Sequence, residues 1–226
     1  ADAVETGYQL MKDDFTTYVF DRRKEISADY SIRDMAGDTA EAMREIGLKD
    51  VYLFGASQGG MIAMVIAIEY PELVKKLVLG STSSHVMPKQ QEVIDKWIQL
   101  ALEKDRQALY RSFGKEIYPA DVYQQYEGYF DEVSQTVTDE ELERFVILAG
   151  SILSFHVTDE LRAIQCPVLT IGVYEDAVLD SDATMEIAEK FDDRPDFKLY
   201  MYVGYGHAAF DTAPDYRDRI YQFFMR

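Results

Sequence analysis

Short apolar runs alternate with stretches of helically spaced apolar residues along most of the chain. The runs are rich in β-branched, aliphatic and aromatic side chains, which indicates buried strands, and the spaced stretches indicate amphipathic or buried helices. The predicted strands are residues 51–54, 76–80, 167–171 and 197–203, and the predicted helices are residues 31–46, 59–70, 182–191 and 214–225. This alternation favours an α/β fold, with a mostly parallel sheet and helices on both of its faces.

Two further elements are predicted before residue 31. Residues 3–13 carry a weak helical pattern. Residues 15–20 (FTTYVF) are β-branched and aromatic and end at the charged residues 21–23, so they are predicted to form a buried strand.

The alternation stops between about residue 85 and residue 160. This stretch is helical in pattern, contains no convincing strand and is rich in aromatic residues. The chain is therefore divided into a body, residues 1–84 and 161–226, and a helical insertion, residues 85–160. Most aromatic residues of the insertion are expected to pack with one another and against the body, while one or two reach a substrate. They are Trp97, Tyr110, Phe113, Tyr118, Tyr123, Tyr126, Tyr129 and Phe130.

The strongest chemical motif lies where the strand 51–54 meets the helix 59–70. The sequence GASQGG matches a G-x-S-x-G turn centred on Ser57, in the required strand–turn–helix context. Such a turn lifts the hydroxyl clear of the sheet and points the first helix amides at a reacting oxygen. Gly55 and Gly59 are expected because strand and helix approach closely on either side of the serine. Ser57 is the candidate nucleophile, and the Gln58 amide is the candidate oxyanion donor.

A serine hydroxyl needs an adjacent base, and the chain has three histidines. His207 follows the last predicted strand, at the sheet edge where α/β proteins assemble their sites, and is favoured. His85 also follows a strand and is second. His156 is expected to have a structural or surface role.

The base in turn needs a carboxylate that fixes its tautomer and stabilises its cation. Glu175 and Asp176 both follow the strand 167–171. Asp176 is favoured over Glu175, with Asp180 a distant third. The order Ser57, Asp176, His207 along the chain is the order of nucleophile, acid and base expected on an α/β sheet of this kind.

Composition narrows the classes of partner. The chain has 41 acidic and 23 basic residues and a net charge of −18, which disfavours binding to nucleic acid or to an anionic membrane surface. No apolar stretch approaches the roughly 20 residues that span a bilayer. The single cysteine, Cys166, leaves no intramolecular disulfide and fits a reducing, cytoplasmic compartment. No metal and no organic cofactor is expected.

With these motifs in view, the sequence resembles the α/β-hydrolase superfamily over essentially its whole length. The resemblance is carried by residues 51–84 (VYLFGASQGG onward), by CPVLTIGVYEDAVLD and by YVGYGHAAF. It implies Ser57 as nucleophile, Asp176 as acid and His207 as base, and residues 85–160 as a helical cap over the pocket.

The sequence departs from the family at its beginning. The family has further N-terminal strands and a Gly-rich loop that donates the second oxyanion-hole amide, and no such loop precedes residue 15. Loss of one donor typically costs about 10²–10³ in rate. The expectation is that the native protein has an upstream segment that carries these strands and this loop.

The leading functional hypothesis is a serine hydrolase that acts on a carboxylic ester or a related small acyl substrate through an acyl-enzyme. A C–C hydrolase, a lactonase or an aminopeptidase with the same triad is the alternative. The rival from another class is a non-catalytic ligand-binding protein on the same scaffold. The expected partner is a small-molecule acyl substrate, and assembly into a homo-oligomer is left open.

Overall fold

The computed structural model describes residues 6–226 and contains a four-stranded parallel sheet. The strand order is β1-β2-β3-β4, so each strand pairs with its neighbours in sequence order. The strands are β1 (Val51–Ala56), β2 (Val74–Gly80), β3 (Val168–Val173) and β4 (Phe197–Tyr202). All four match strands predicted from the sequence. Their carboxyl ends meet at one edge of the sheet, which is where Ser57, Asp176 and His207 follow.

The two central strands separate two apolar clusters. Leu77 and Leu79 of β2 contribute to one cluster, whereas Val78, between them, contributes to the other. This is the two-residue period of a strand whose faces are both buried. The continuous apolar runs in the sequence therefore arise because neither face of these strands meets water.

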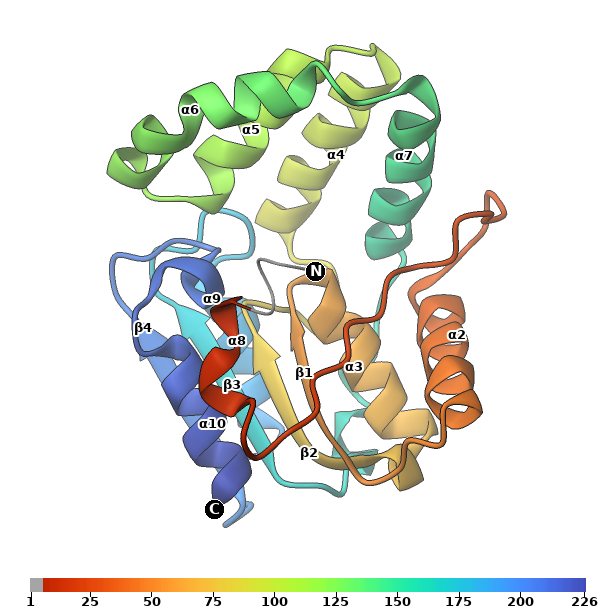
Figure 1. Cartoon of the computed structure of the whole chain (residues 1–226), viewed down its shortest axis with the longest axis vertical. Helices are drawn as coiled ribbons and strands as arrows, with labels where there is room; N and C mark the ends of the chain where they lie inside the picture. Colours follow the sequence, from red (N-terminus) through yellow and green to blue (C-terminus); the bar gives the residue numbers. More distant parts are fainter. Residues whose placement is uncertain (1–5) are drawn as a thin grey trace.

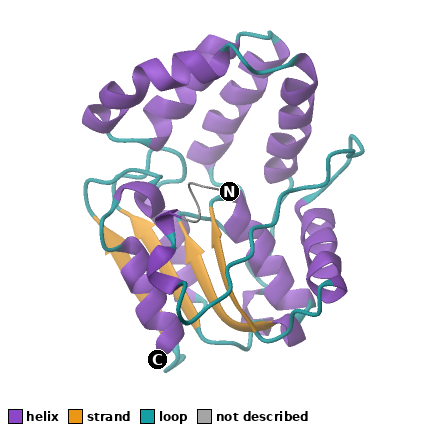
Figure 2. Cartoon of the chain, in the orientation of Figure 1, coloured by secondary structure: helices purple, strands orange, loops and turns teal. Residues whose placement is uncertain are grey.

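Helices cover both faces, as the sequence predicts (Figures 1 and 2). One cluster contains buried residues of α2 (Ile32–Glu45), α3 (Gln58–Glu69) and α8 (Ser181–Glu189). The other contains buried residues of the short helix η1 (Gln9–Met11), of α9 (Ala209–Thr212) and of α10 (Tyr216–Met225). Two further short helices, η2 (Pro71–Leu73) and η3 (Leu161–Ala163), lead into β2 and toward β3.

Four helices follow β2 and lie above the carboxyl edge of the sheet (Figure 1). They are α4 (Pro88–Leu102), α5 (Arg106–Ile117), α6 (Ala120–Ser134) and α7 (Asp139–Leu153). Their aromatic residues pack mainly with one another: the ring centroid of Phe113 lies 4.8 Å from that of Trp97 and 5.4 Å from that of Phe145. Below this helical layer, His85 and His156 form an isolated antiparallel bridge that joins the chain entering the layer to the chain leaving it.

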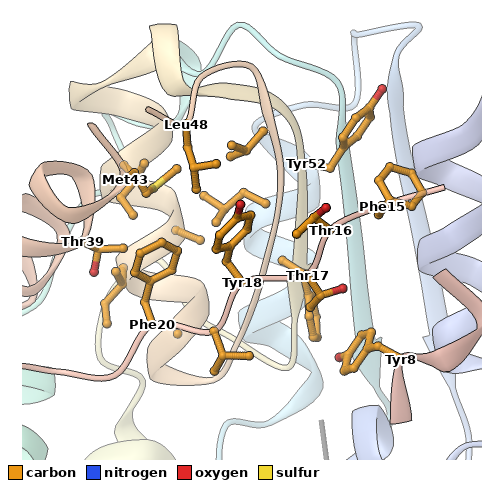
Figure 3. Close-up of a pocket in the computed structure, with 18 of the residues that line it drawn as sticks. Tyr8, Phe15, Thr16, Thr17, Tyr18, Phe20, Thr39, Met43, Leu48 and Tyr52 are labelled. Atoms are coloured by element: carbon orange, nitrogen blue, oxygen red, sulfur yellow. The ribbon is translucent and has the colours of Figure 1, made fainter. Parts of the chain in front are cut away.

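The prediction of a strand at residues 15–20 is wrong. The segment is irregular, it makes no backbone hydrogen bond to β1, and its residues 16–19 are exposed. Its β-branched and aromatic composition is typical of a strand, but a strand also needs a partner in register, and here a cavity separates the segment from β1 (Figure 3). Of the predicted helix at residues 3–13, residues 3–5 lie outside the described residues, and η1 forms within the remainder.

Within residues 6–226, the structure contains no helix with the length and apolar character required to span a membrane.

Candidate active site

Ser57 lies on a strained turn between β1 and α3. Its backbone has φ 52° and ψ −124°, in a region that residues with a side chain rarely adopt. Two hydrogen bonds hold the backbone of the turn. The Ser57 amide donates to the Gly80 carbonyl at 2.9 Å, and the Thr82 hydroxyl donates to the Ser57 carbonyl at 2.7 Å. The side chain is half-buried, and no hydrogen bond joins its hydroxyl to His207 in the described part of the chain.

Two glycines make this turn sterically feasible. A Cβ on Gly55 would lie 2.2 Å from the carbonyl oxygen of Gly59, and a Cβ on Gly60 would lie 2.6 Å from the side chain of Thr82. Gly59 itself has open space where a Cβ would be. The expectation that Gly59 must be small is therefore wrong: the helix approaches the strand through the backbone of residue 59, so the constraint falls on Gly55.

Asp176 and His207 form a buried pair at the carboxyl ends of β3 and β4. Nδ1 of His207 lies 2.8 Å and 3.0 Å from the two carboxylate oxygens of Asp176. Both side chains are at most 5% exposed. Contact through Nδ1 leaves Nε2 of the ring free to exchange a proton with another group.

The surroundings of Asp176 hold it in the charged form. Burial alone would raise the pKa of its carboxyl, but the charge and hydrogen bond of His207 and the amides of Val178 and Leu179 lower it, and the net effect is a pKa below the ordinary value. Both amides donate to Oδ1 at 2.9 Å. A buried carboxylate with this many donors remains charged and keeps its orientation.

The other candidate acids lie elsewhere. Glu175 is exposed and accepts from the Gly204 amide at 2.7 Å, so it tethers the loop after β4. Asp180 is exposed, precedes α8 and accepts from the Ser181 amide. Of the three carboxylates predicted from the sequence, only Asp176 contacts His207.

The other two histidines also lie apart from this pair. His85 is half-buried, with Nδ1 3.2 Å from the Thr158 hydroxyl and 3.5 Å from a Glu186 carboxylate oxygen, and His156 is exposed beside it. Within residues 6–226, no cluster of three or more histidine, cysteine, aspartate or glutamate side chains could hold a metal ion.

Gln58 has a second role that the sequence did not indicate. Its backbone amide is the first of α3, where amides lack an acceptor within the helix. Its side chain, however, bridges three segments: it donates to the Leu148 carbonyl of α7 at 2.7 Å and accepts from the Arg22 guanidinium at 2.8 Å. The residue after the nucleophile thus ties the turn to the helical layer, through contacts between residues distant in sequence.

The helical layer also contacts the acid and the base. Lys89 of α4 donates to the Asp176 carbonyl at 3.0 Å, and the amide of Ala208 donates to the Ile117 carbonyl of α5 at 3.0 Å. Both contacts link α4 or α5 to a residue at or next to the Asp176–His207 pair. Sequence reasoning missed Lys89 because no local motif marks it.

The cavity beside the segment 15–22 does not contain the three candidate residues. It has a volume of about 670 Å³ and is lined by the segment, β1 and one side of α3 (Figure 3). Gly59 lies on its wall, whereas Ser57, Asp176 and His207 do not. The chemistry suggested by the Asp176–His207 pair therefore belongs to the sheet edge under the helical layer.

Comparison with known proteins finds curated relatives and solved structures similar to this chain. Two curated relatives carry the name "Putative carbamate hydrolase RutD". The relative from Pantoea ananatis is 21% identical, over 84% of this chain and 69% of the relative. The relative from Pseudomonas savastanoi pv. phaseolicola is 26% identical, over 84% of this chain and 73% of the relative. The solved structure of an enol-lactonase from Burkholderia xenovorans LB400 superposes with a TM-score of 0.84 at 16% identity, over 99% of this chain and 86% of that one.

A family model described as alpha/beta hydrolase fold matches residues 5–214, which is nearly the whole chain. The match includes β1 to β4, the turn at Ser57, and the loops that carry Asp176 and His207. The chain belongs to the α/β-hydrolase family and is a hydrolase.

Proposed function

We propose that the protein is a serine hydrolase that cleaves carboxylic esters or related small acyl compounds through Ser57, His207 and Asp176. The buried Asp176–His207 pair is the observation that carries this proposal. A histidine held at Nδ1 by a buried carboxylate, at the same carboxyl edge of the sheet as a serine on a strained turn, supports the assignment of a general base and a nucleophile.

The proposal assigns one step of the reaction to each group. Nε2 of His207 removes the proton of the Ser57 hydroxyl, and the oxygen attacks the acyl carbon. Asp176 stabilises the imidazolium that forms, and the Gln58 amide donates to the developing oxyanion. His207 returns the proton to the leaving group and then activates the water that releases the acyl group from Ser57.

Carbamates are a second candidate substrate class. The curated relatives described above are named as carbamate hydrolases, and a carbamate presents the same acyl carbon to a serine nucleophile. Esters and carbamates with a common leaving group would separate the two classes by their kcat/KM values.

Covalent labelling by a fluorophosphonate tests the nucleophile. One adduct is expected, mapped to Ser57 by peptide mass and absent from Ser57→Ala and His207→Ala. Ser27→Ala, which removes an exposed hydroxyl that forms no hydrogen bond, is the matched control and should label like the wild type. A folded protein that stays unlabelled, or that labels at another serine, would contradict the proposal.

A further inference from the structure

The helical layer above the sheet edge (Figure 1) contacts the proposed acid through Lys89 of α4. The ammonium group of Lys89 donates to the Asp176 carbonyl at 3.0 Å, and the carboxylate of the same residue holds His207. Lys89 is half-buried and forms no ion pair among residues 6–226, although the chain has 41 acidic residues. A lysine that engages the backbone of the acid, in a chain with so many carboxylates, indicates a specific contact.

This contact restrains the loop of Asp176 in a way that the loop does not restrain itself. The amides of Val178 and Leu179 orient the Asp176 carboxylate, but both belong to the same loop and do not tie it to the helical layer. The hydrogen bond from Lys89 does tie it to α4. Its donor is charged, and such hydrogen bonds are roughly twice as strong as those between neutral groups. The position of the acid relative to α4 therefore depends on Lys89.

The proposed base is held by the carboxyl end of α5, through both of its neighbours in the chain. The Ala208 amide donates to the Ile117 carbonyl at 3.0 Å, and a Cβ on Gly206 would lie 2.9 Å from the same oxygen. Ile117 is the last residue of α5, where carbonyls have no donor within the helix. The backbone on either side of His207 therefore lies against this one carbonyl.

The loop of His207 needs such external contacts because it contains two glycines. Gly204 has φ 81° and Gly206 has φ 66°, in the left-handed region, and glycine leaves a backbone more freedom than any other residue. Asp176 restricts rotation of the ring through Nδ1, but the distance from Nε2 to the Ser57 hydroxyl also depends on where the loop backbone lies. A displacement of about 1 Å can cost about 10² in rate. Contacts that fix this backbone therefore affect the rate without touching the substrate.

We propose that Lys89 and the carboxyl end of α5 position the Asp176–His207 pair, so that the helical layer controls the reach of the base toward Ser57 as well as covering the sheet edge. Lys89 is a positioning residue that acts through Asp176, and the Ile117 carbonyl acts through the backbone beside His207. This inference rests on the proposed function and adds to it the groups that hold the acid and the base in place.

Lys89→Met tests the acid side, because methionine keeps much of the apolar stem and lacks the ammonium group. With 4-nitrophenyl acetate as substrate, kcat should fall about 10-fold, as expected for a lost charge-assisted hydrogen bond. KM should change less than about 3-fold, because Lys89 contacts the acid and not the substrate. Lys89→Arg keeps a charged donor and should recover most of the loss. The control Lys96→Met removes an exposed lysine of the same helix and should change kcat less than about 2-fold. Equal kcat values in Lys89→Met and Lys96→Met would overturn the proposal.

Gly206→Ala tests the base side, with Gly204→Ala as its matched control. Both glycines have a positive φ, so alanine strains the backbone similarly at the two positions. At Gly206 the new Cβ would lie 2.9 Å from the Ile117 oxygen and 3.1 Å from Pro119, whereas at Gly204 nothing lies within 4 Å of it. Gly206→Ala should therefore lower kcat at least about 10-fold more than Gly204→Ala does. Equal falls in the two variants would overturn the role of α5.

The proton on Nδ1 of His207 separates this proposal from the catalytic one. Held between Nδ1 and the Asp176 carboxylate, it should give a low-field resonance in the proton NMR spectrum, identified by its loss in His207→Ala. The resonance should shift or broaden in Lys89→Met and in Gly206→Ala, and it should stay unchanged in the lysine control. That result would support the positioning role even if fluorophosphonate labelling failed. An unchanged resonance in Lys89→Met and Gly206→Ala would overturn the positioning role, even if Ser57 labelled as proposed.

Discussion

The glycines of the nucleophile turn give opposite predictions for three similar substitutions. Gly55→Ala places a Cβ 2.2 Å from the Gly59 oxygen, 2.6 Å from its carbonyl carbon and 2.8 Å from the Gly60 nitrogen. All three atoms are backbone, so none can rotate away and the turn itself must move. We expect a loss of at least about 3 kcal/mol in the free energy of unfolding, at the upper end of ordinary overpacking.

Gly60→Ala should be destabilising for a different reason. Its Cβ would meet the side chain of Thr82 at 2.6 to 2.7 Å. Thr82 can rotate, but it then loses its hydrogen bond to the Ser57 carbonyl. We expect a loss of about 2 kcal/mol, together with a lower rate of labelling at Ser57.

Gly59→Ala should be tolerated, because nothing lies within 4 Å of the position that its Cβ would take and the residue lies in the first turn of α3. Replacing a helical glycine by alanine stabilises by up to about 1 kcal/mol. For a chain of this size, 1 kcal/mol shifts Tm by about 2–4 °C. Thermal denaturation should therefore show a fall of about 6–12 °C for Gly55→Ala and no fall for Gly59→Ala. Equal destabilisation by the two variants would refute the reasoning.

Three further predictions follow from the charges and burial of single side chains. Asp176→Asn should lower kcat/KM about 10³- to 10⁴-fold, because an amide stabilises the wrong tautomer of His207. The control Glu175→Gln should change kcat/KM little, and similar losses in the two variants would refute the assignment of Asp176 as the acid. The folded-state pKa of Asp176 lies below the unfolded value near 3.9, so the stability it contributes is complete above about pH 4 and is lost as the pH falls through the folded value. The Tm of the wild type should therefore fall more steeply below pH 4 than the Tm of Asp176→Asn. Equal slopes of Tm against pH in the two proteins would contradict this prediction. Burial raises the pKa of the Cys166 thiol to about 11. At pH 8 a thiol reagent should therefore modify the native protein about two orders of magnitude more slowly than the unfolded protein. Equal rates of modification would contradict this prediction.

The centre of the sheet could be predicted from the sequence because β2 and β3 are buried on both faces. Such strands appear as continuous apolar runs, and β2 and β3 show this clearly in residues such as Leu77, Val78 and Ile171. The segment 15–20 has a similar composition but forms no strand. An apolar run of this kind forms a strand only if another strand lies beside it to accept its backbone hydrogen bonds. The composition of the run does not show whether such a partner is present.

The candidate site likewise has residues that the sequence predicts and contacts that it does not. Ser57, Asp176 and His207 could be located because each follows a strand, and the chain order and local motifs restrict their roles. The side-chain contacts of Gln58 with α7 and Arg22, and of Lys89 with the Asp176 loop, could not. They join residues more than 30 positions apart, and no local spacing encodes them.

The bridge between His85 and His156 has a consequence for how the sequence of this protein can change in evolution. The amide of Val157 also donates to the Ser84 carbonyl at 2.8 Å, so the chain leaves the sheet and returns to it at almost the same point. A segment with adjacent ends can be lengthened, shortened or exchanged without displacing the strands on either side. The helices above Ser57 can therefore be exchanged without displacing the strands, provided that the new helices again supply partners for Gln58, for the Asp176 carbonyl and for the Ala208 amide.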